Sequence, residues 1–483
     1  MSITKYLSTY SESEAGLALQ LINARYPSNS LYQRFDYSLC LPCFDEHTRD
    51  AQRFIDFIDT QTNTLLVLVL NEPSHTQQLS ANNIALRQHL LNIDDNCQQL
   101  QNLTLIKSKN DSAILLVERT HDTQCIPSKQ GVGLARKIAA DIVTLFIHNN
   151  LVRHPWIHCC DADSSLPFDY FIAINRQHND THCSAITYPF LHQHTEPQSE
   201  PKQQRLVNQQ DIDLATQLYD WRLRQYVQGL HHAGSAYAFY ALGSILAIHY
   251  RYYAIARGFP KRAGGEDFYL LNKLRKLGRI EIAASTPLLI RPRVSHRAPF
   301  GTGEAVTKLI NSQHATDVAL FYNPIIFSLL KIALRWLDNA YPQQEFLQRS
   351  LHKASKEKAI AMLSKSLADE ITKEWLDEQT KENATQNPIL SEQAAANNIA
   401  ISFLSVGIEQ FFAHSNKQCQ HVDNYRQHAM QWFDGFKTLK WVHASEKQGL
   451  QKLSAKALNR DFGIYVVSET RPDSTAIKQS SPS

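Results

Sequence analysis

Two acidic residues follow directly after an apolar segment of the chain. Asp161 and Asp163 come after residues 156–160, Trp-Ile-His-Cys-Cys, which are expected to form a buried strand. Carboxylates at such a strand end are costly to bury unless they are paired or bind a cation. Mg²⁺ and Mn²⁺ prefer carboxylate, phosphate and water oxygens. The context therefore favours a divalent-cation site with Asp163 as direct ligand and Asp161 on a metal-bound water or a ribose hydroxyl. A simpler interpretation, two acids that start a helix at Pro167, stays open.

The D-x-D triplet by itself carries little information, because the chain contains it twice. The second copy, residues 211–213, stands at the start of an expected helix, where acidic side chains cap the helix and interact with its dipole. The position of the first copy after a buried strand is what distinguishes it.

A glycine-rich loop supplies a second pair of acids. Gly264 and Gly265 precede Glu266 and Asp267, and an amphipathic basic segment follows them. Glycines allow a ligand to approach the backbone closely. An acid at the start of a helix is positioned to take a proton from a hydroxyl that attacks an anomeric carbon. We therefore assign Asp267 as the catalytic base and Glu266 as the second choice; a helix N-cap is the competing interpretation.

A third cluster is basic and ends another expected strand. Residues 290–297 contain three arginines and one histidine. Arg293 and Arg297 suit diphosphate oxygens, which guanidinium groups bind through charge-assisted hydrogen bonds. His296 is a candidate third metal ligand, although a lone histidine among basic residues is more often an ordinary surface residue.

The elements that must position these clusters alternate between strands and helices. Expected strands at residues 37–42, 64–70, 103–106, 113–117 and 156–160 are separated by helical patterns, for example from residue 131 onward. This order predicts an α/β fold with an open, mostly parallel sheet, helices on both faces, and ligands beyond the carboxyl ends of the strands. The expected division is an N-terminal extension (1–33), an α/β catalytic domain (34–303), a mainly α-helical C-terminal domain (304–470) and a disordered tail (471–483).

Composition narrows the partners only slightly. The 483-residue chain has a formal net charge of +3, which gives no field to favour nucleic acid, and no apolar run reaches the roughly 18 residues of a transmembrane helix. Eight scattered cysteines suit reduced thiols in a cytoplasm better than a disulfide framework. The oligomeric state stays open, a homo-oligomer included.

The order of these motifs over residues 37–303 resembles that of GT-A-fold glycosyltransferases, and of glycosyltransferase family 2 in particular. The resemblance implies a Rossmann-like domain that uses Mg²⁺ or Mn²⁺ to move a sugar from a nucleotide-diphosphate sugar to a hydroxyl of a small-molecule or glycan acceptor. It adds an acid-rich turn after the first strand, a base-side turn at Asn71, and a glycine-opened helix with a basic residue facing the donor. It also supports Asp267 as base and His296 as metal ligand. The complete expected donor-binding set is Pro42, Phe44, Glu46, Asn71, Arg136, Lys137, Asp161, Arg293 and Arg297.

The chain departs from that family pattern at one point, since Arg257 stands where the first glycine of the acceptor-side turn is expected. Two other functions stay open. Cys40 and Cys43, spaced as C-x-P-C between a strand and a helix, would suit a thiol redox site. A nucleotide-sugar-binding protein without catalysis, or a sugar-1-phosphate nucleotidyltransferase, would share the fold, although the glycine-rich opening loop of the latter is absent.

Overall fold

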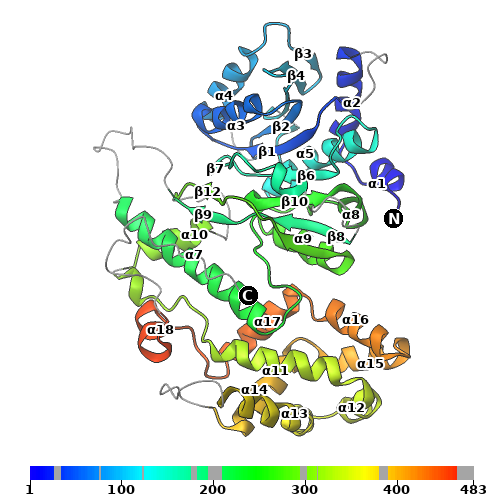
Figure 1. Cartoon of the computed structure of the whole chain (residues 1–483), viewed down its shortest axis with the longest axis vertical. Helices are drawn as coiled ribbons and strands as arrows, with labels where there is room; N and C mark the ends of the chain where they lie inside the picture. Colours follow the sequence, from blue (N-terminus) through cyan, green and yellow to red (C-terminus); the bar gives the residue numbers. More distant parts are fainter. Residues whose placement is uncertain are drawn as a thin grey trace. The chain divides into compact units, whose positions relative to one another are not determined.

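The computed structural model describes residues 1–26, 34–74, 78–121, 124–175, 182–193, 209–293, 302–312, 314–379 and 390–464. The chain divides into two compact units (Figure 1). The α/β unit comprises Met1–Val207 and Phe239–Ala305, and the helical unit comprises Asn208–Ala238 and Val306–Ser483. The chain thus passes from the α/β unit to the helical unit, returns to the α/β unit, and ends in the helical unit.

A nine-stranded sheet forms the centre of the α/β unit, in the order β11-β8-β10-β6-β1-β2-β5-β4-β3. Only β4 and β10 run opposite to the other seven of the nine strands. The strands are β1 (Tyr37–Cys43), β2 (Thr64–Asn71), β3 (Gln98–Leu100), β4 (Leu103–Lys107), β5 (Ala113–Arg119), β6 (Trp156–Cys159), β8 (Cys183–Thr187), β10 (Leu246–His249) and β11 (Arg279–Ile282). This arrangement confirms the predicted α/β class with a mostly parallel sheet.

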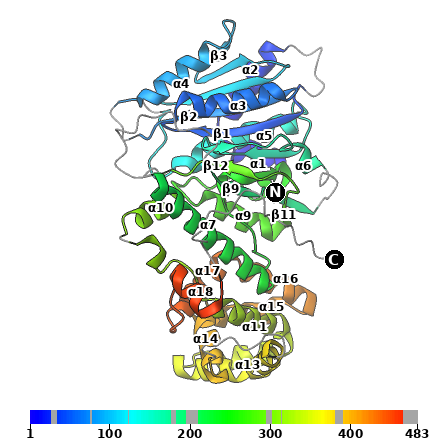
Figure 2. The same ribbon diagram turned by 60° about the vertical axis from the view of Figure 1, so that its left-hand side comes forward.

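Helices cover both faces of this sheet (Figure 2). The Leu/Val run of β2 is buried along its whole length, as expected for a parallel strand that is covered on both sides. The α/β unit contains α1 (Ile3–Thr9), α2 (Glu14–Arg25), α3 (Thr48–Thr60), α4 (Ala81–Leu91), α5 (Gly131–His148), α6 (Ile172–Asn175), α8 (Tyr250–Ile255) and α9 (Glu266–Leu277). Helices α2 and α5 share one core with the sheet, and α3 and α4 pack on the opposite face.

A small second sheet lies beside the large one in the α/β unit. It joins β7 (Ser164–Ser165), β12 (Leu288–Ile290) and β9 (Phe190–His192), in that order. Strand β7 directly follows the acidic triplet, and β12 directly precedes the arginine cluster. Their antiparallel pairing therefore brings two sequence clusters together that are about 130 residues apart along the chain.

The first 26 residues are part of the α/β core, although the sequence pattern suggests a separate extension at 1–33. Tyr6 of α1 donates its hydroxyl to the buried carboxylate of Asp141 in α5, which also accepts hydrogen bonds from Tyr253 (2.9 Å) and Lys137 (2.8 Å). A buried charge needs such partners, and α1 supplies one of them.

The helical unit begins with α7 (Gln209–His232), which the predicted boundaries place in the α/β domain. In the structure, α7 belongs with α11, because Gly229 leaves room for the ring of Phe327: a Cβ at Gly229 would lie 2.4 Å from that ring. The other helices are α11 (Ile325–Asn339), α12 (Gln344–Leu351), α13 (Lys356–Gln379), α14 (Glu392–Ser405), α15 (Ile408–Gln418), α16 (Val422–Trp432), α17 (Gly435–Glu446) and α18 (Ala455–Phe462), while α10 (Thr302–Ile310) spans the change of unit. The mainly helical C-terminal part is confirmed.

The predicted tail at residues 471–483 lies outside the described residues. Among the described helices, none combines the length and apolarity that crossing a membrane requires.

The start of α5 depends on a glycine that permits close backbone contact. Gly133 donates its N–H to the carbonyl of Arg262 (3.0 Å), and a Cβ there would lie 2.4 Å from the carbonyl oxygen of Pro260. We expect Gly133→Ala to destabilise the protein by about 1–3 kcal/mol or more, because backbone rather than a flexible side chain must move. Urea unfolding would measure the change. Gly16→Ala is the matched control: this helical position has open space around it, and stability should stay equal or rise. A Gly133→Ala variant as stable as the control would contradict this packing.

A buried histidine in β6 predicts a pH dependence of stability. His158 bonds through Nδ1 to the hydroxyl of Tyr188 (3.1 Å), which itself donates to the carbonyl of Tyr170 (2.9 Å). Burial lowers the pKa of His158 from 6.5 to about 3. The unfolded chain therefore takes up a proton near pH 6.5 that the folded protein excludes, and stability falls as the pH falls below that value. We expect this residue to account for a loss of roughly 2 kcal/mol between pH 7.5 and pH 5. Urea titrations at both pH values should show a smaller loss in His158→Phe than in the unaltered protein.

Candidate functional site

The acidic residues singled out in the sequence meet at the carboxyl edge of the parallel strands. β1, β2 and β6 run in one direction, so that the turns after them lie at the same edge. Glu46 follows β1, Asn71 ends β2, and Asp161 and Asp163 follow β6. This is the edge at which open α/β sheets bind ligands.

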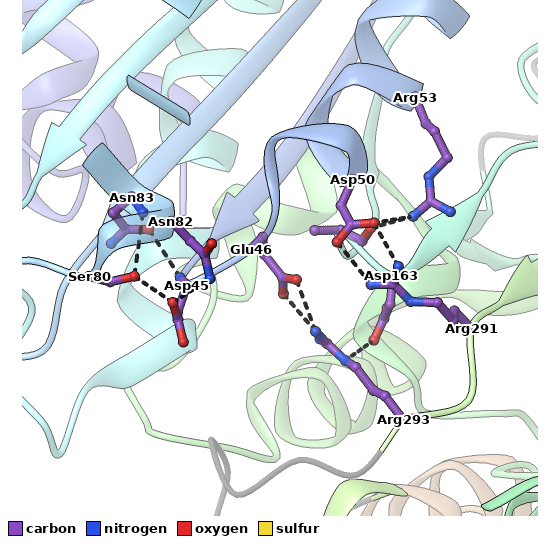
Figure 3. Close-up of polar contacts among 11 residues, drawn as sticks. Asp45, Glu46, Asp50, Arg53, Ser80, Asn82, Asn83, Asp163, Arg291 and Arg293 are labelled. Carbon is purple, nitrogen blue, oxygen red and sulfur yellow. Dashed lines mark hydrogen bonds and ion pairs between the residues drawn. The ribbon is translucent and has the colours of Figure 1, made fainter. Parts of the chain in front are cut away.

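Two arginines that follow β12 tie this edge together (Figure 3). Arg293 pairs through Nε with Asp163 (2.9 Å) and through Nη1 with both carboxylate oxygens of Glu46 (3.0 and 2.9 Å). Arg291 makes a bidentate pair with Asp50 (2.8 and 2.9 Å), and its backbone N–H donates to the carbonyl of Asp163 (2.9 Å). The predicted arginine cluster therefore contacts the predicted acidic pair directly.

A single buried guanidinium connects the two acidic clusters on the other side of the site. Arg136 donates from Nε to Glu266 (2.9 Å), from Nη2 to Asp161, and from Nη1 to the carbonyl of Gly243 (3.1 Å). Its side chain is only 3% exposed. Each of its three nitrogens thus has an acceptor within the protein.

The two acids of the glycine loop have different surroundings. Gly265 adopts φ 69°, a left-handed conformation that suits glycine, and so turns the chain into α9. Glu266 is buried and accepts the hydrogen bond from Arg136. Asp267 is half-buried and accepts a bond from the backbone N–H of Phe268 (2.7 Å). Burial, and next the charge of Glu266, raise the pKa of Asp267 to about 7, against the opposing charge of Arg136. Asp267 is thereby suited to exchange a proton near neutral pH, as a general base must.

The turns after β1 and β2 are joined by a polar corner (Figure 3). Asn83 donates to the carbonyl of Asn71 (3.0 Å) and to Glu72 (2.7 Å), and its side-chain oxygen accepts the N–H of Asp45 (3.0 Å). Asp45, at φ 52°, also accepts hydrogen bonds from Ser80 and from Asn82 (2.9 Å). This corner gives the turn after β1 a defined shape next to Glu46.

Several residues at this edge have no role assigned from the sequence. Asp45, Glu72 and Arg291 lie within the predicted turns and the predicted arginine cluster but are not among the expected site residues. Asp50 and Arg53 lie outside every predicted motif. All five take part in the contacts of this edge. Asp50 and Arg53 carry a weak signal in the sequence, an acid and a base three residues apart in the first turns of a helix. Such a pair is ordinary on helix surfaces, so the signal could not single them out.

Other predicted residues have different places. Lys137 points toward α1 and bonds to Tyr6 (2.9 Å) and Asp141, in the buried network described above. Pro42 is buried within β1, and Phe44 in the turn after it is half-buried. His296 and Arg297 lie outside the described residues.

The acids at this edge can still supply oxygens to a cation. The pKa of Asp161 is raised, mainly by burial and further by the charges of Asp163 and Glu266, although the positive charge of Arg136 opposes this shift. Asp161 and Asp163 each use one carboxylate oxygen to pair with an arginine, and both side chains stay partly exposed, at 31% and 16%. Within the described ranges, no three His, Cys, Asp or Glu side chains are grouped as a metal site. The two acids fit a cation such as Mg²⁺ or Mn²⁺ that takes its remaining ligands from phosphate and water.

The geometry of Cys40 and Cys43 argues against the thiol redox alternative. Both residues lie inside β1 and are completely buried. Side chains three residues apart in a strand point to opposite faces of the sheet, so these thiols face away from each other. Burial also raises the pKa of the Cys40 thiol, which makes it less reactive.

Comparison with known proteins finds neither a matching family model nor a matching curated protein. Similar solved structures include S. aureus TarS 1-349 in complex with UDP-GlcNAc, at 10% identity and TM-score 0.33, covering 81% of this chain and 90% of that one. The complex of TarS 1-349 with UDP has 9% identity and TM-score 0.30, covering 81% and 89%. S. aureus TarS at greater length has 12% identity and TM-score 0.30, covering 81% and 54%. Likeness at this level establishes neither family membership nor activity.

Proposed function

We propose that this protein is a metal-dependent glycosyltransferase that moves a sugar from a nucleotide-diphosphate sugar to a hydroxyl of a small-molecule or glycan acceptor. One observation carries the proposal. Three segments far apart in the sequence, around Asp163, Asp267 and Arg293, meet at the carboxyl edge of a parallel sheet, linked by ion pairs through Arg136 and Arg293. This arrangement offers cation ligands, a base and diphosphate-binding cations in one place.

The donor side of the reaction would use Asp163, Asp161 and Arg293. When bound, Mg²⁺ or Mn²⁺ would be held by Asp163, with Asp161 on a bound water or a ribose hydroxyl, and would neutralise the charge on the leaving diphosphate. Arg293, at 27% side-chain exposure, can donate to diphosphate oxygens from beside Asp163. Arg297 and His296 extend this proposal as a second diphosphate contact and a further metal ligand.

The acceptor side would use Asp267. Its carboxylate takes the proton of the acceptor hydroxyl while that oxygen forms a bond to the anomeric carbon and the bond from this carbon to the diphosphate breaks. Glu266 is less suited to the role, because it is buried and already bonded to Arg136. The assignment of Asp267 as base applies to a reaction that inverts configuration.

The remaining donor contacts follow from the polar corner. Glu46, Phe44 and Asn71 border the turns after β1 and β2, where we place the base and ribose of the nucleotide, with Pro42 shaping the strand end.

The eight cysteines all lie within the described residues, and none of them forms a disulfide. Reduced thiols suit a reducing compartment, so we place the protein in the cytoplasm.

A thermal-shift screen tests this function. UDP-, GDP- and ADP-sugars would be added with and without Mn²⁺, and release of nucleoside diphosphate would then be measured for any that bind. The expected result is a metal-dependent rise in melting temperature with one donor class, followed by release. A shift without release under any acceptor condition would favour a non-catalytic nucleotide-sugar-binding protein, and no shift with any donor would contradict the proposal.

A further inference from the structure

The guanidinium of Arg136 lies between the donor side and the acceptor side of the proposed site. It bonds to Asp161, beside the proposed cation, and to Glu266, which directly precedes the proposed base. These two acids are 105 residues apart in the chain, and both are paired with the same guanidinium. Arg136 is therefore the physical connection between the two halves of the site.

We infer that Arg136 is a positioning residue that couples Asp161 to Glu266, so that the donor-side and acceptor-side acids are oriented as one unit. This inference rests on the proposed function and assigns Arg136 a role through other side chains instead of direct contact with the donor.

The packing around Arg136 leaves its guanidinium little freedom to move. A Cβ on Gly243 would lie 2.2 Å from Nη2 and 2.5 Å from the central guanidinium carbon, so only glycine accommodates the group at this distance. The Gly243 carbonyl accepts a third hydrogen bond from Nη1 (3.1 Å). A planar guanidinium group that donates to three protein acceptors is held in one orientation, and the ammonium group of a lysine could not make the same three bonds.

The charges add a second form of coupling. The positive charge of Arg136 is shared between two carboxylates. If one carboxylate is removed, the other becomes the only acidic partner of that charge within the pair. A buried arginine that loses one acid cannot turn to water and must rely more strongly on its remaining partner. If Glu266 becomes neutral, Arg136 should therefore pair more tightly with Asp161 and compete more effectively with a cation there.

Mn²⁺ binding to the full-length protein, followed by electron paramagnetic resonance, tests this coupling without any donor. We expect Glu266→Gln to weaken Mn²⁺ binding by about three- to tenfold, as for directly coupled residues. Glu14→Gln is the matched control, since Glu14 is also buried and paired with an arginine, Arg119, at 3.2 Å, but belongs to no part of the site. It should leave Mn²⁺ affinity within about twofold, the scale of uncoupled sites.

A second comparison asks whether the coupling passes through Arg136. Gly243→Ala displaces the guanidinium without changing any charge, so Glu266→Gln should lose its effect on Mn²⁺ affinity in that background and keep it in a Gly16→Ala background. Should Gly243→Ala fail to fold, as judged by circular dichroism, Arg136→Lys serves as the background with the same expectation.

Failure of the inference and failure of the proposed function give different results. If the unaltered protein binds Mn²⁺, and Asp163→Asn abolishes this binding, but Glu266→Gln behaves like Glu14→Gln, Arg136 does not couple the two sides. The same conclusion follows if Glu266→Gln has an equal effect in the Gly243→Ala and Gly16→Ala backgrounds. If Asp163→Asn and the unaltered protein bind Mn²⁺ alike, the cation site itself, and with it the proposed function, is wrong.

Discussion

Replacing Asp163 with asparagine is expected to lower Mn²⁺-dependent release of nucleoside diphosphate by a factor of order a hundred to a thousand, the scale for losing one charge-stabilising group in an active site. The amide keeps the shape of the side chain but removes the negative charge that would hold the cation. Arg293 retains Glu46 as a partner, with contacts of 3.0 and 2.9 Å, so the arginine is not left unpaired and the fold should persist. Initial rates at several Mn²⁺ concentrations, with circular dichroism as a check of folding, would measure the effect.

The chain offers a matched control for this variant in its second D-x-D triplet. Asp213 is exposed on α7 in the helical unit and bonds to Gln209 (3.0 Å) within the same helix. Asp213→Asn should leave both the rate and its dependence on Mn²⁺ unchanged. Equal activity in the Asp163→Asn and Asp213→Asn variants would contradict the assignment of Asp163 as a metal ligand, because only its position after a buried strand distinguishes the first triplet from the second.

Replacing Asp267 with asparagine should reduce kcat by a factor of order a hundred to ten thousand, because the amide cannot accept the proton of the acceptor hydroxyl. Donor affinity should change little, since Asp267 is assigned to the acceptor side.

The activity of the unaltered enzyme should also depend on pH. The pKa of Asp267 is raised to about 7 by burial and by Glu266, and a base acts only when ionised. The rate should therefore rise with pH, level off above about pH 7, and fall tenfold for each unit below it.

Comparison with Glu266→Gln decides between the two acids of the loop. If Asp267→Asn lowers kcat and also removes the rise of the rate with pH below about 7, the proton transfer is assigned to Asp267. If Asp267→Asn instead keeps both kcat and its dependence on pH, while Glu266→Gln loses both, the base is Glu266. Binding of the donor, measured by thermal shift for each variant, separates a defect in chemistry from a defect in donor binding.

Local patterns were sufficient for the elements and for part of the site. The Leu/Val run of β2 and the apolar segment before Asp161 predict buried strands, because the burial of each strand depends on its own side chains. Since the carboxyl ends of parallel strands share an edge, the same reasoning places Glu46, Asn71 and Asp163 near one another. The glycine turn before Glu266 was also recognisable, because its left-handed conformation is a local property of the backbone.

Other features were inaccessible to such reasoning. Arg136 and Lys137 are neighbours in one helix and look equivalent in the sequence, yet successive helical residues point in different directions, here to the site and to the buried carboxylate of Asp141 respectively. Helix α7 has an amphipathic pattern that shows only that it packs on something. Its assignment to the helical unit depends on the complementary surface of α11, where Gly229 makes room for Phe327.

By itself, the sequence determined the class of fold, the strand ends that carry acids, and the loop that carries the candidate base, since each of these depends on interactions over a few residues. Only the tertiary structure decided which charges pair. Arg136 lies between Asp161 and Glu266, and Arg293 bridges Asp163 and Glu46, across separations of up to 247 residues. An ion pair depends on distance in space, and that distance is set by the order of strands in the sheet and by the pairing of β7 with β12, which no local pattern specifies.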